Sequence, residues 1–401
     1  MSSIFRPGRR RPVLAVAAIA AALAFTTTAC DDGGKKNDAQ SQSSQKPTKP
    51  DDLGIPKDLQ KKKDLPDSLK DLDKWRGGAW KHWSKDQWVR KAGDFVNPYI
   101  KGHWKPHRMK KATDNEKQVP KNVQSTSTDT GTDPTPSPVK AKAVPMPYTK
   151  NAAPAGKVFM DTPKGAMVCS GTVIKDPRHP GKSNLVATAG HCVHAGKEGG
   201  WYRNIMFVPA YNNKGLSPAQ TNTAPVQDVA PYGRWWAQWA QTTDYWIGKG
   251  AESGGSGSQH DFAVLNVKPE QQGSGKSLEE TVGNAVKVNF HAPSINSFRS
   301  LRNYGYPAAP PFNGARMYSC LGKPGRLTID PSAPAEYRMG CTMTGGSSGG
   351  GWFMKGKSGK PELVSVNSIG PHPATWLAGP HLGGTEKGVL NAISKKYANQ
   401  G

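Results

Sequence analysis

The sequence is short of acidic residues, cysteines and long apolar runs, and these shortages exclude several classes of protein or site. The apolar run at residues 13–25 is too short to span a bilayer as a helix. The five cysteines form no Cys-x-x-Cys pair and no His/Cys cluster that suggests zinc. His103 and His107 have a helical metal-ligand spacing, but Pro106 lies between them, so we predict no metal and no organic cofactor.

The sequence also contains few apolar residues and many residues that disfavour helices. Apolar residues make up 35% of the 401-residue chain and the mean hydropathy is -0.66, so we expect part of the chain to be polar and unpacked. The 45 glycines and 34 prolines favour turns over long helices. The formal net charge of +24 favours attraction to an anionic cell-envelope surface. We expect no nucleic-acid partner, because the chain has no recognisable binding motif for one.

Residues 1–30 have the form of an export signal, with arginines before the apolar run and small polar residues after it. Cys30 directly follows Ala29, which resembles the cleavage point of a bacterial lipoprotein, although Thr27 stands where leucine is usual. We therefore expect an exported protein, either a cell-surface lipoprotein anchored through Cys30 or a secreted one. Any membrane contact would be made through that lipid alone.

Four cysteines remain once Cys30 is set aside, and an even number outside the cytoplasm indicates two disulfides. The sequence alone permits three connectivities. We favour the pairing of nearest neighbours, Cys169–Cys192 and Cys320–Cys341.

The N-terminal part of the chain divides by composition into three segments. Residues 31–64 are rich in Lys, Gln, Ser, Asp and Pro, which is typical of a disordered tether. Residues 65–118 carry tryptophans and leucines at helical spacing between lysines, which predicts a small Trp-rich helical segment. We rank three roles for it: a propeptide, then a layer on a membrane or wall, then a minor helical module. Residues 119–150 contain Ser/Thr/Pro runs and are expected to be an exposed linker open to processing.

Residues 151–401 have the pattern of a β domain. Helical spacing is weak there until a short C-terminal helix around Leu390 and Ile393. Many short strands without intervening helices favour an all-β barrel or sandwich. Short apolar segments alternate with Gly/Pro/Asn turns, at residues 168–174, 185–189, 261–267, 286–290 and 363–366.

Three separate blocks contain the residue types that acyl transfer by serine requires. Such chemistry needs a hydroxyl nucleophile, a base to take its proton and a carboxylate to hold the base in one tautomer. We assign these roles to Ser348, His191 and Asp261. The blocks are Thr188-Ala189-Gly190-His191-Cys192, His260-Asp261-Phe262-Ala263-Val264-Leu265 and Gly345-Gly346-Ser347-Ser348-Gly349-Gly350.

Glycines around Ser348 permit a tight backbone in which N–H groups converge on a developing oxyanion. We predict that the N–H groups of Gly346 and Ser348 form that oxyanion hole. Ser347 is a rival nucleophile, but only Ser348 is followed directly by two glycines. Asp228 and Asp244 are rival carboxylates, and neither precedes an apolar strand as Asp261 does.

In the order His, Asp, Ser, the three blocks resemble the signature blocks of the trypsin/chymotrypsin superfamily of serine proteases. The motif Gly-Gly-Ser-Ser-Gly-Gly resembles the corresponding motif in the bacterial branches of the superfamily, which include glutamyl endopeptidases. The resemblance covers roughly residues 151–401. It implies two packed six-stranded antiparallel barrels with the triad in the cleft between them. It also implies that Cys169–Cys192 joins the strand before the histidine to the histidine segment.

The sequence departs from the animal enzymes at Ser347, where an aspartate usually pairs with a freed N-terminal amine, so we do not expect that form of activation. By the family's spacing, Thr342 lies at the base of the primary substrate pocket, with Ser365 in its wall. Thr342 is neutral, so we do not expect a strict preference for Lys or Arg.

These observations together predict an exported, monomeric serine endopeptidase that acts on a polypeptide substrate. Two alternatives stay open. One is an envelope-binding protein on the same fold with little or no catalytic activity, since a fold does not guarantee an activity. The other is an esterase that uses the same triad.

Overall fold

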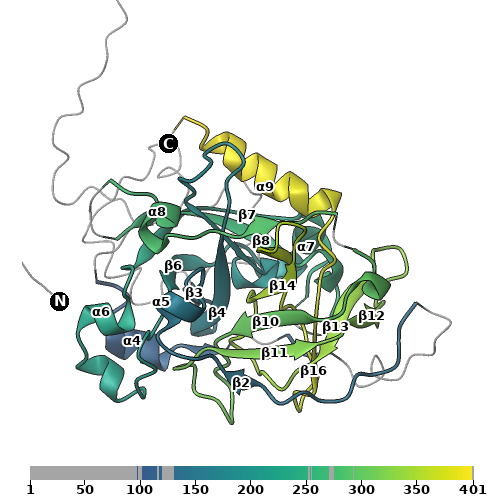
Figure 1. Cartoon of the computed structure of the whole chain (residues 1–401), viewed down its shortest axis with the longest axis horizontal. Helices are drawn as coiled ribbons and strands as arrows, with labels where there is room; N and C mark the ends of the chain where they lie inside the picture. The colour runs from purple at the N-terminus through teal and green to yellow at the C-terminus, as the bar shows by residue number, and fades with distance from the viewer. Residues whose placement is uncertain are drawn as a thin grey trace, which may run out of the picture. The chain divides into compact units, whose positions relative to one another are not determined.

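The computed structural model describes residues 97, 102–114, 117–119, 131–251, 253, 255–270, 275–291 and 293–399. The predicted signal peptide, Cys30, the tether and most of the Trp-rich segment lie outside these residues. The described part is mainly β, with strands gathered into sheets of seven, six and three (Figure 1). No helix in it is long and apolar enough to cross a membrane.

The first half of the domain is a closed six-stranded barrel. Its strand order is β4-β3-β6-β7-β8-β5, and pairing of β4 with β5 closes the ring. Apolar side chains of these strands, with Phe159 and Leu265 fully buried, fill the interior. The strands are β3 (Ala155–Thr162), β4 (Gly165–Ile174), β5 (Leu185–Thr188), β6 (Arg203–Pro209), β7 (Trp235–Thr242) and β8 (Ala263–Pro269).

The second half consists of two sheets around a shared core that contains both Cys320 and Cys341. The three-stranded sheet is β12 (Gly325–Leu327), β13 (Glu336–Gly340) and β16 (Trp376–Gly379). The six-stranded sheet is β2 (Lys142–Ala143), β9 (Lys287–Val288), β10 (Leu301–Gly305), β11 (Tyr318–Gly322), β14 (Gly351–Lys355) and β15 (Pro361–Val366). The chymotrypsin-like fold is therefore confirmed, with the first predicted six-stranded barrel closed and the second half divided into a six-stranded and a three-stranded sheet.

Both disulfides have the predicted nearest-neighbour pairing. Cys169 in β4 bonds to Cys192, and Cys320 in β11 bonds to Cys341, which directly follows β13. The first ties the histidine block to the barrel, and the second ties the two sheets of the second half together.

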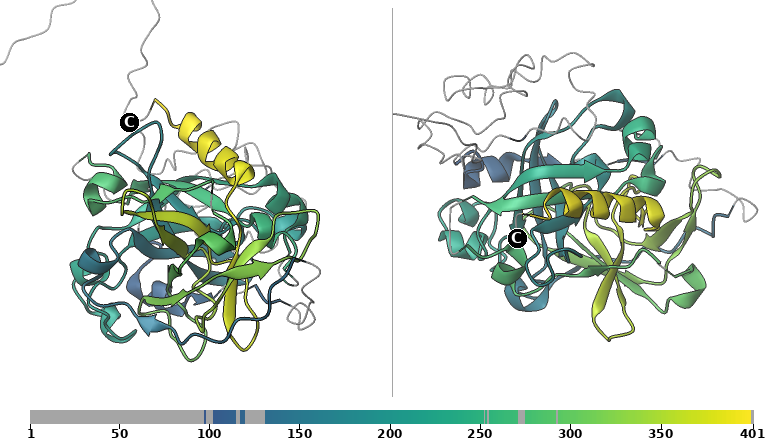
Figure 2. Two further views of the ribbon diagram at one scale, coloured as in Figure 1. Left: turned by 45° about the vertical axis from the view of Figure 1, so that its right-hand side comes forward. Right: turned by 90° about the horizontal axis from the view of Figure 1, so that it is seen from above.

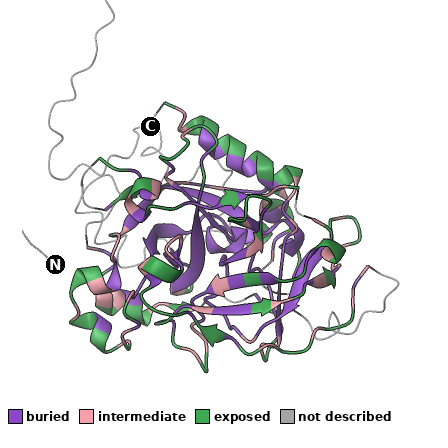
Figure 3. Ribbon diagram, viewed as in Figure 1, coloured by how far each residue is buried: buried purple, intermediate pink, exposed green. Residues whose placement is uncertain are grey.

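The predicted C-terminal helix is α9 (Gly384–Lys396), which contacts β7 and β8 (Figure 2). It buries Val389, Leu390 and Ile393 and exposes most of its other side chains (Figure 3). In the part of the chain that the structure describes, five shorter α-helices lie between strands or before them. They are α4 (Pro106–Lys111), α5 (Tyr148–Asn151), α6 (Val226–Val229), α7 (Asp244–Lys249) and α8 (Leu278–Val282).

The described end of the Trp-rich segment is packed into the first barrel. Trp104 is fully buried in the barrel's core, and its indole donates to the Asn204 carbonyl at 2.6 Å. The Asn97 side chain donates to the carbonyls of Ile205 and Ala237, between β6 and β7. Those two strands pair with each other over only two residues, so Asn97 supplies hydrogen bonds that the sheet lacks there.

A buried charge cluster fixes the same segment to β3. The Asp161 carboxylate lies 2.8 Å from His103 and 2.6 Å from Arg108. Burial alone would raise the pKa of Asp161, but the hydrogen bond and charge of His103 and the charge of Arg108 outweigh it and lower the pKa. His103 is buried and bound to Asp161, whereas His107, four residues later, is exposed.

Replacing Trp104 with alanine is expected to destabilise the whole barrel. Removing a fully buried tryptophan side chain costs about 3–5 kcal/mol of unfolding free energy. Urea denaturation of the full chain measures this loss, with exposed His107→Ala as the control, expected within about 0.5 kcal/mol of the parent. A Trp104→Ala loss no greater than the control's would contradict the packing described.

Candidate active site

The histidine and aspartate blocks meet because their strands are neighbours. Thr188 at the end of β5 pairs with Ala263 at the start of β8. His191 lies in a one-turn 3-10 helix just after β5, and Asp261 lies just before β8. The His191 ring nitrogen Nδ1 is 2.6 Å from Asp261 Oδ2, and the His191 backbone N–H donates to Oδ1 at 2.8 Å.

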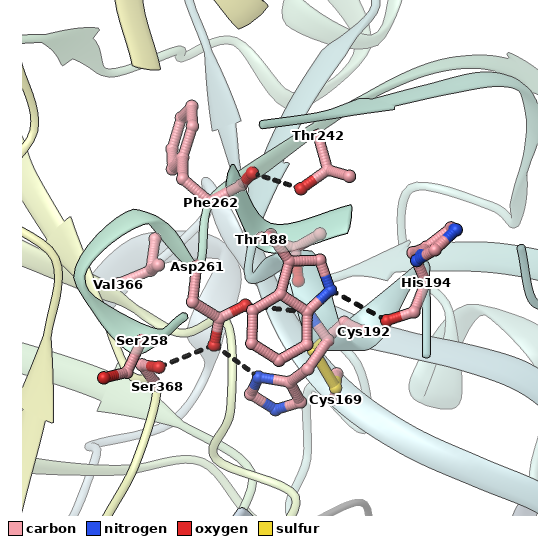
Figure 4. A network of polar contacts seen from close by, with 12 residues as sticks. Cys169, Thr188, Cys192, His194, Thr242, Ser258, Asp261, Phe262, Val366 and Ser368 are labelled. Atoms are coloured by element: carbon pink, nitrogen blue, oxygen red, sulfur yellow. Dashed lines mark hydrogen bonds and ion pairs between the residues drawn. A yellow bond between two sulfur atoms is a disulfide. The ribbon is translucent and has the colours of Figure 1, made fainter. Parts of the chain in front are cut away.

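Asp261 is fully buried, and its hydrogen bonds come from His191 and Ser368. Besides the two bonds from His191, the Ser368 hydroxyl donates to Oδ2 at 2.5 Å (Figure 4). Burial alone would raise the pKa of Asp261, but the charge of His191 and the hydrogen bonds from His191 and Ser368 lower it. Asp261 is therefore a carboxylate at neutral pH, and it holds the imidazole in one orientation.

Close packing behind the histidine requires glycine at position 190. A Cβ there would lie 2.8 Å from Trp246 and 2.9 Å from Asp261 Oδ1. Trp246 is buried, its ring centre lies 6.1 Å from that of His191, and its indole donates to the His194 carbonyl at 2.9 Å. Of the tryptophans between His191 and Asp261, Trp235, Trp236 and Trp246 are buried and Trp239 is partly buried.

The serine block lies against the histidine strand. The Ser348 carbonyl accepts from the Ser170 N–H of β4 at 2.7 Å, and the Gly349 N–H donates to the Asn367 carbonyl at 2.7 Å. Gly349 has a φ of +77°, and a Cβ there would overlap the hydroxyl of Thr188. Thr188 is three residues before His191, so the turn at Ser348 is seated where the two halves of the domain meet.

The turn before Ser348 carries the two N–H groups that the oxyanion-hole prediction names, and that role stays a prediction. Gly346 has a φ of +91°, and a Cβ there would lie 2.8 Å from the side chain of Ala308, so no other residue fits easily. Among the described residues, no backbone hydrogen bond uses the N–H of Gly346 or of Ser348. The rival nucleophile Ser347 donates its hydroxyl to the Thr344 carbonyl at 2.8 Å and is buried.

The rival carboxylates lie elsewhere. Asp228 pairs with Lys214 at 3.0 Å, and Asp244 is exposed at the start of α7.

Sequence reasoning missed a second buried pair, beside Asp261. His260 Nδ1 lies 2.6 Å from Glu386 of α9, and the His260 carbonyl accepts from the Thr243 hydroxyl. These bonds tie the turn before Asp261 to the C-terminal helix. The pair is 126 positions apart in the chain, so no local pattern could have found it.

A small pocket of about 10 Å³ lies beside Ser348. Its lining comes mainly from the turn before Ser348 and from the segment after β15, namely Lys117, Thr344, Gly345, Ser347, Ser348, Asn367, Ser368, Ile369, Gly370 and Leu377. Thr342 and Ser365 are not in this lining. The Thr342 hydroxyl accepts from the Ala141 N–H at 2.9 Å, and Ser365 is fully buried in β15. Their role in substrate selection stays a prediction.

No protein-family model and no curated protein matched the chain. Two solved structures are similar to it. A thermostable serine protease, AL20, from an extremophilic microorganism is 31% identical, with 61% of this chain and 98% of that one covered and a TM-score of 0.49. Protease Anisep from Arthrobacter nicotinovorans is 30% identical, with 64% and 99% covered and a TM-score of 0.49.

The aligned region spans nearly the whole length of both of these proteases. The chain itself has the chymotrypsin-like fold, with His191 in contact with Asp261 and the turn at Ser348 packed against β4 and β5.

Proposed function

We propose that the chain is a serine endopeptidase that uses Ser348, His191 and Asp261. The observation that carries the proposal is the fully buried Asp261 carboxylate, with both its oxygens hydrogen-bonded to His191 and a third bond from Ser368. A buried carboxylate is costly in a fold unless it has such partners, and this arrangement leaves the far side of the imidazole to act as a base.

The proposed reaction assigns each of these residues a step. Ser348 Oγ attacks the scissile carbonyl carbon while His191 Nε2 takes the hydroxyl proton, and Asp261 stabilises the imidazolium that forms. The N–H groups of Gly346 and Ser348 bind the oxyanion of the tetrahedral intermediate. Collapse breaks the C–N bond, and His191 gives its proton to the leaving amine. Water, with its proton taken by His191, then hydrolyses the acyl-enzyme and restores Ser348.

The proposal extends to the compartment of the protein. Two disulfides that lie in the protease domain suit an oxidising environment outside the cytoplasm. Export, a lipid on Cys30, contact with an anionic envelope and a monomeric state all remain predictions from the sequence.

Substitution of the nucleophile is the first test. Ser348→Ala should abolish covalent labelling by a fluorescent phosphonofluoridate and lower peptide turnover by at least about a thousandfold. Ser358→Ala, in the exposed turn between β14 and β15, serves as the control and should label like the parent. Labelling that maps to a residue other than Ser348, or that survives in Ser348→Ala, would refute the assignment. Comparing ester with peptide turnover separates an esterase from a peptidase.

The lowered pKa of Asp261 gives a prediction for stability against pH. An unfolded aspartate has a pKa of about 3.9, so the ionised carboxylate stabilises the fold above that pH. This contribution is lost as the pH falls through the lower folded pKa. Urea denaturation should therefore show Asp261→Asn clearly less stable than the parent at pH 7, with the difference shrinking toward pH 2. A difference that stays constant or widens on acidification would contradict this.

A further inference from the structure

Residues 117–119 lie beside Ser348, where Lys117 lines the small pocket and Gln118 forms isolated β-bridges. Lys117 and Val119 are buried, at 3% and 6% exposure, while Gln118 between them is exposed. This alternation is that of a strand with one face on the protein. Lys117 and Gln118 end the predicted Trp-rich segment, and Val119 begins residues 119–150. The prediction that residues 119–150 form an exposed linker is wrong at Val119, Thr132, Ala141, Val144 and Tyr148, which are buried.

The backbone of this segment pairs with the strand edge that follows β15. The Val119 N–H donates to the Gly370 carbonyl at 3.2 Å, and the Gly370 N–H donates to the Lys117 carbonyl at 3.4 Å. Gln118 forms parallel bridges with both Gly370 and Ser253, so it lies between the two halves of the domain. Gly370 is two residues after Ser368, whose hydroxyl bonds to Asp261. The segment therefore occupies an edge that an extended peptide would use for β-strand addition.

The two inward side chains fill the surface on either side of that edge. Val119 packs in an apolar cluster with Leu327, Ile369, Trp376 and Ala378. Lys117 lines the pocket beside Ser348, and its Nζ lies 5.9 Å from the Trp246 ring, which packs against His191. With Lys117 in place, the pocket holds about 10 Å³, roughly the space that a single water needs.

The chain on both sides of this segment is fixed to the domain. Upstream, Trp104 is buried in the first barrel, and β1 (Thr113–Asp114) pairs with β4. Downstream, Asp133 forms an ion pair with Arg326 of β12, and the Thr132 hydroxyl accepts from the Thr328 N–H. Attachment at both ends gives the segment a high effective concentration at the cleft, so a free peptide competes poorly with it.

We propose that residues 117–119 are an intramolecular occupant of the substrate-binding groove and keep the full-length chain latent. The proposal rests on the serine endopeptidase assignment and gives the Trp-rich segment a definite action. The Trp-rich segment is anchored on the first barrel through Trp104, and residues 117–119 block the approach of a peptide to Ser348. Activity then requires the displacement of residues 117–119 from Gly370.

A matched pair of charge substitutions tests this in the full-length chain. Val119→Asp places an unpaired carboxylate in the apolar cluster, which should expel the segment. Gln118→Asp adds the same charge at the exposed neighbour and should leave the segment in place. We expect the rate of Ser348 labelling by a phosphonofluoridate to rise at least about tenfold in Val119→Asp and to stay within about twofold of the parent in Gln118→Asp. Lys117→Ala, which adds no buried charge, should change the rate in the same direction as Val119→Asp.

Hydrogen exchange on the same proteins separates this proposal from the proposed function. The Val119 and Gly370 amides should exchange slowly in the parent and fast in Val119→Asp, with β3 and β4 protected in both. Equal labelling rates in the parent, Val119→Asp and Lys117→Ala would overturn latency, as would fast exchange of Val119 in the parent. Slow exchange in the parent, lost in Val119→Asp without any labelling of Ser348, would support the occupant and overturn the endopeptidase assignment.

Discussion

A carboxylate that water does not reach lies at the centre of this molecule, and much of the surrounding structure serves to keep it ionised. Asp261 receives two hydrogen bonds from His191 and one from Ser368, which come from different halves of the domain. An uncompensated buried charge would cost several kcal/mol, so the domain cannot reach its folded state without bringing these segments together. The same bonds that stabilise the fold also orient the base.

The chain around this carboxylate is packed so closely that side chains are excluded at several positions. Gly190 touches both Trp246 and Asp261, and Gly349 lies on Thr188 of the histidine strand. The Cys169–Cys192 disulfide fixes the histidine turn to β4. The positions of the candidate catalytic groups therefore come from backbone contacts between strands, which are stiffer than contacts between long side chains.

Trp104 and residues 117–119, which precede the protease domain in the chain, also pack against it. Trp104 fills part of the first barrel's core, and residues 117–119 lie on the edge that follows Ser368. Trp104 and residues 117–119 belong to the same stretch of chain. Because Trp104 completes a core and residues 117–119 cover the site at Ser348, this stretch links the stability of the domain to access to Ser348. Release of the site then requires the bridges of Gln118 to Gly370 and Ser253 to break and Val119 to leave its apolar cluster, while Trp104 remains buried.

The fold and the candidate triad could be predicted because their signals are local. Each candidate triad residue is marked by its immediate neighbours, as Ser348 is by its glycines, and α9 is marked by the spacing of Leu390 and Ile393. Contacts between distant parts of the chain carry no such marks. The hydrogen bond of Ser368 to Asp261 and the pair of His260 with Glu386 depend on tertiary packing alone. The tryptophan spacing around Trp104 indicated an amphipathic surface but not the barrel that buries it.

The rate at which Ser348 reacts with a phosphonofluoridate in Asp261→Asn, compared with the parent chain at neutral pH, tests the central claim most directly. Asparagine keeps the shape of the side chain but cannot hold His191 in the required tautomer or stabilise its charge. The account predicts that the rate falls by about a thousandfold or more. A folded Asp261→Asn protein that reacts within tenfold of the parent would contradict it.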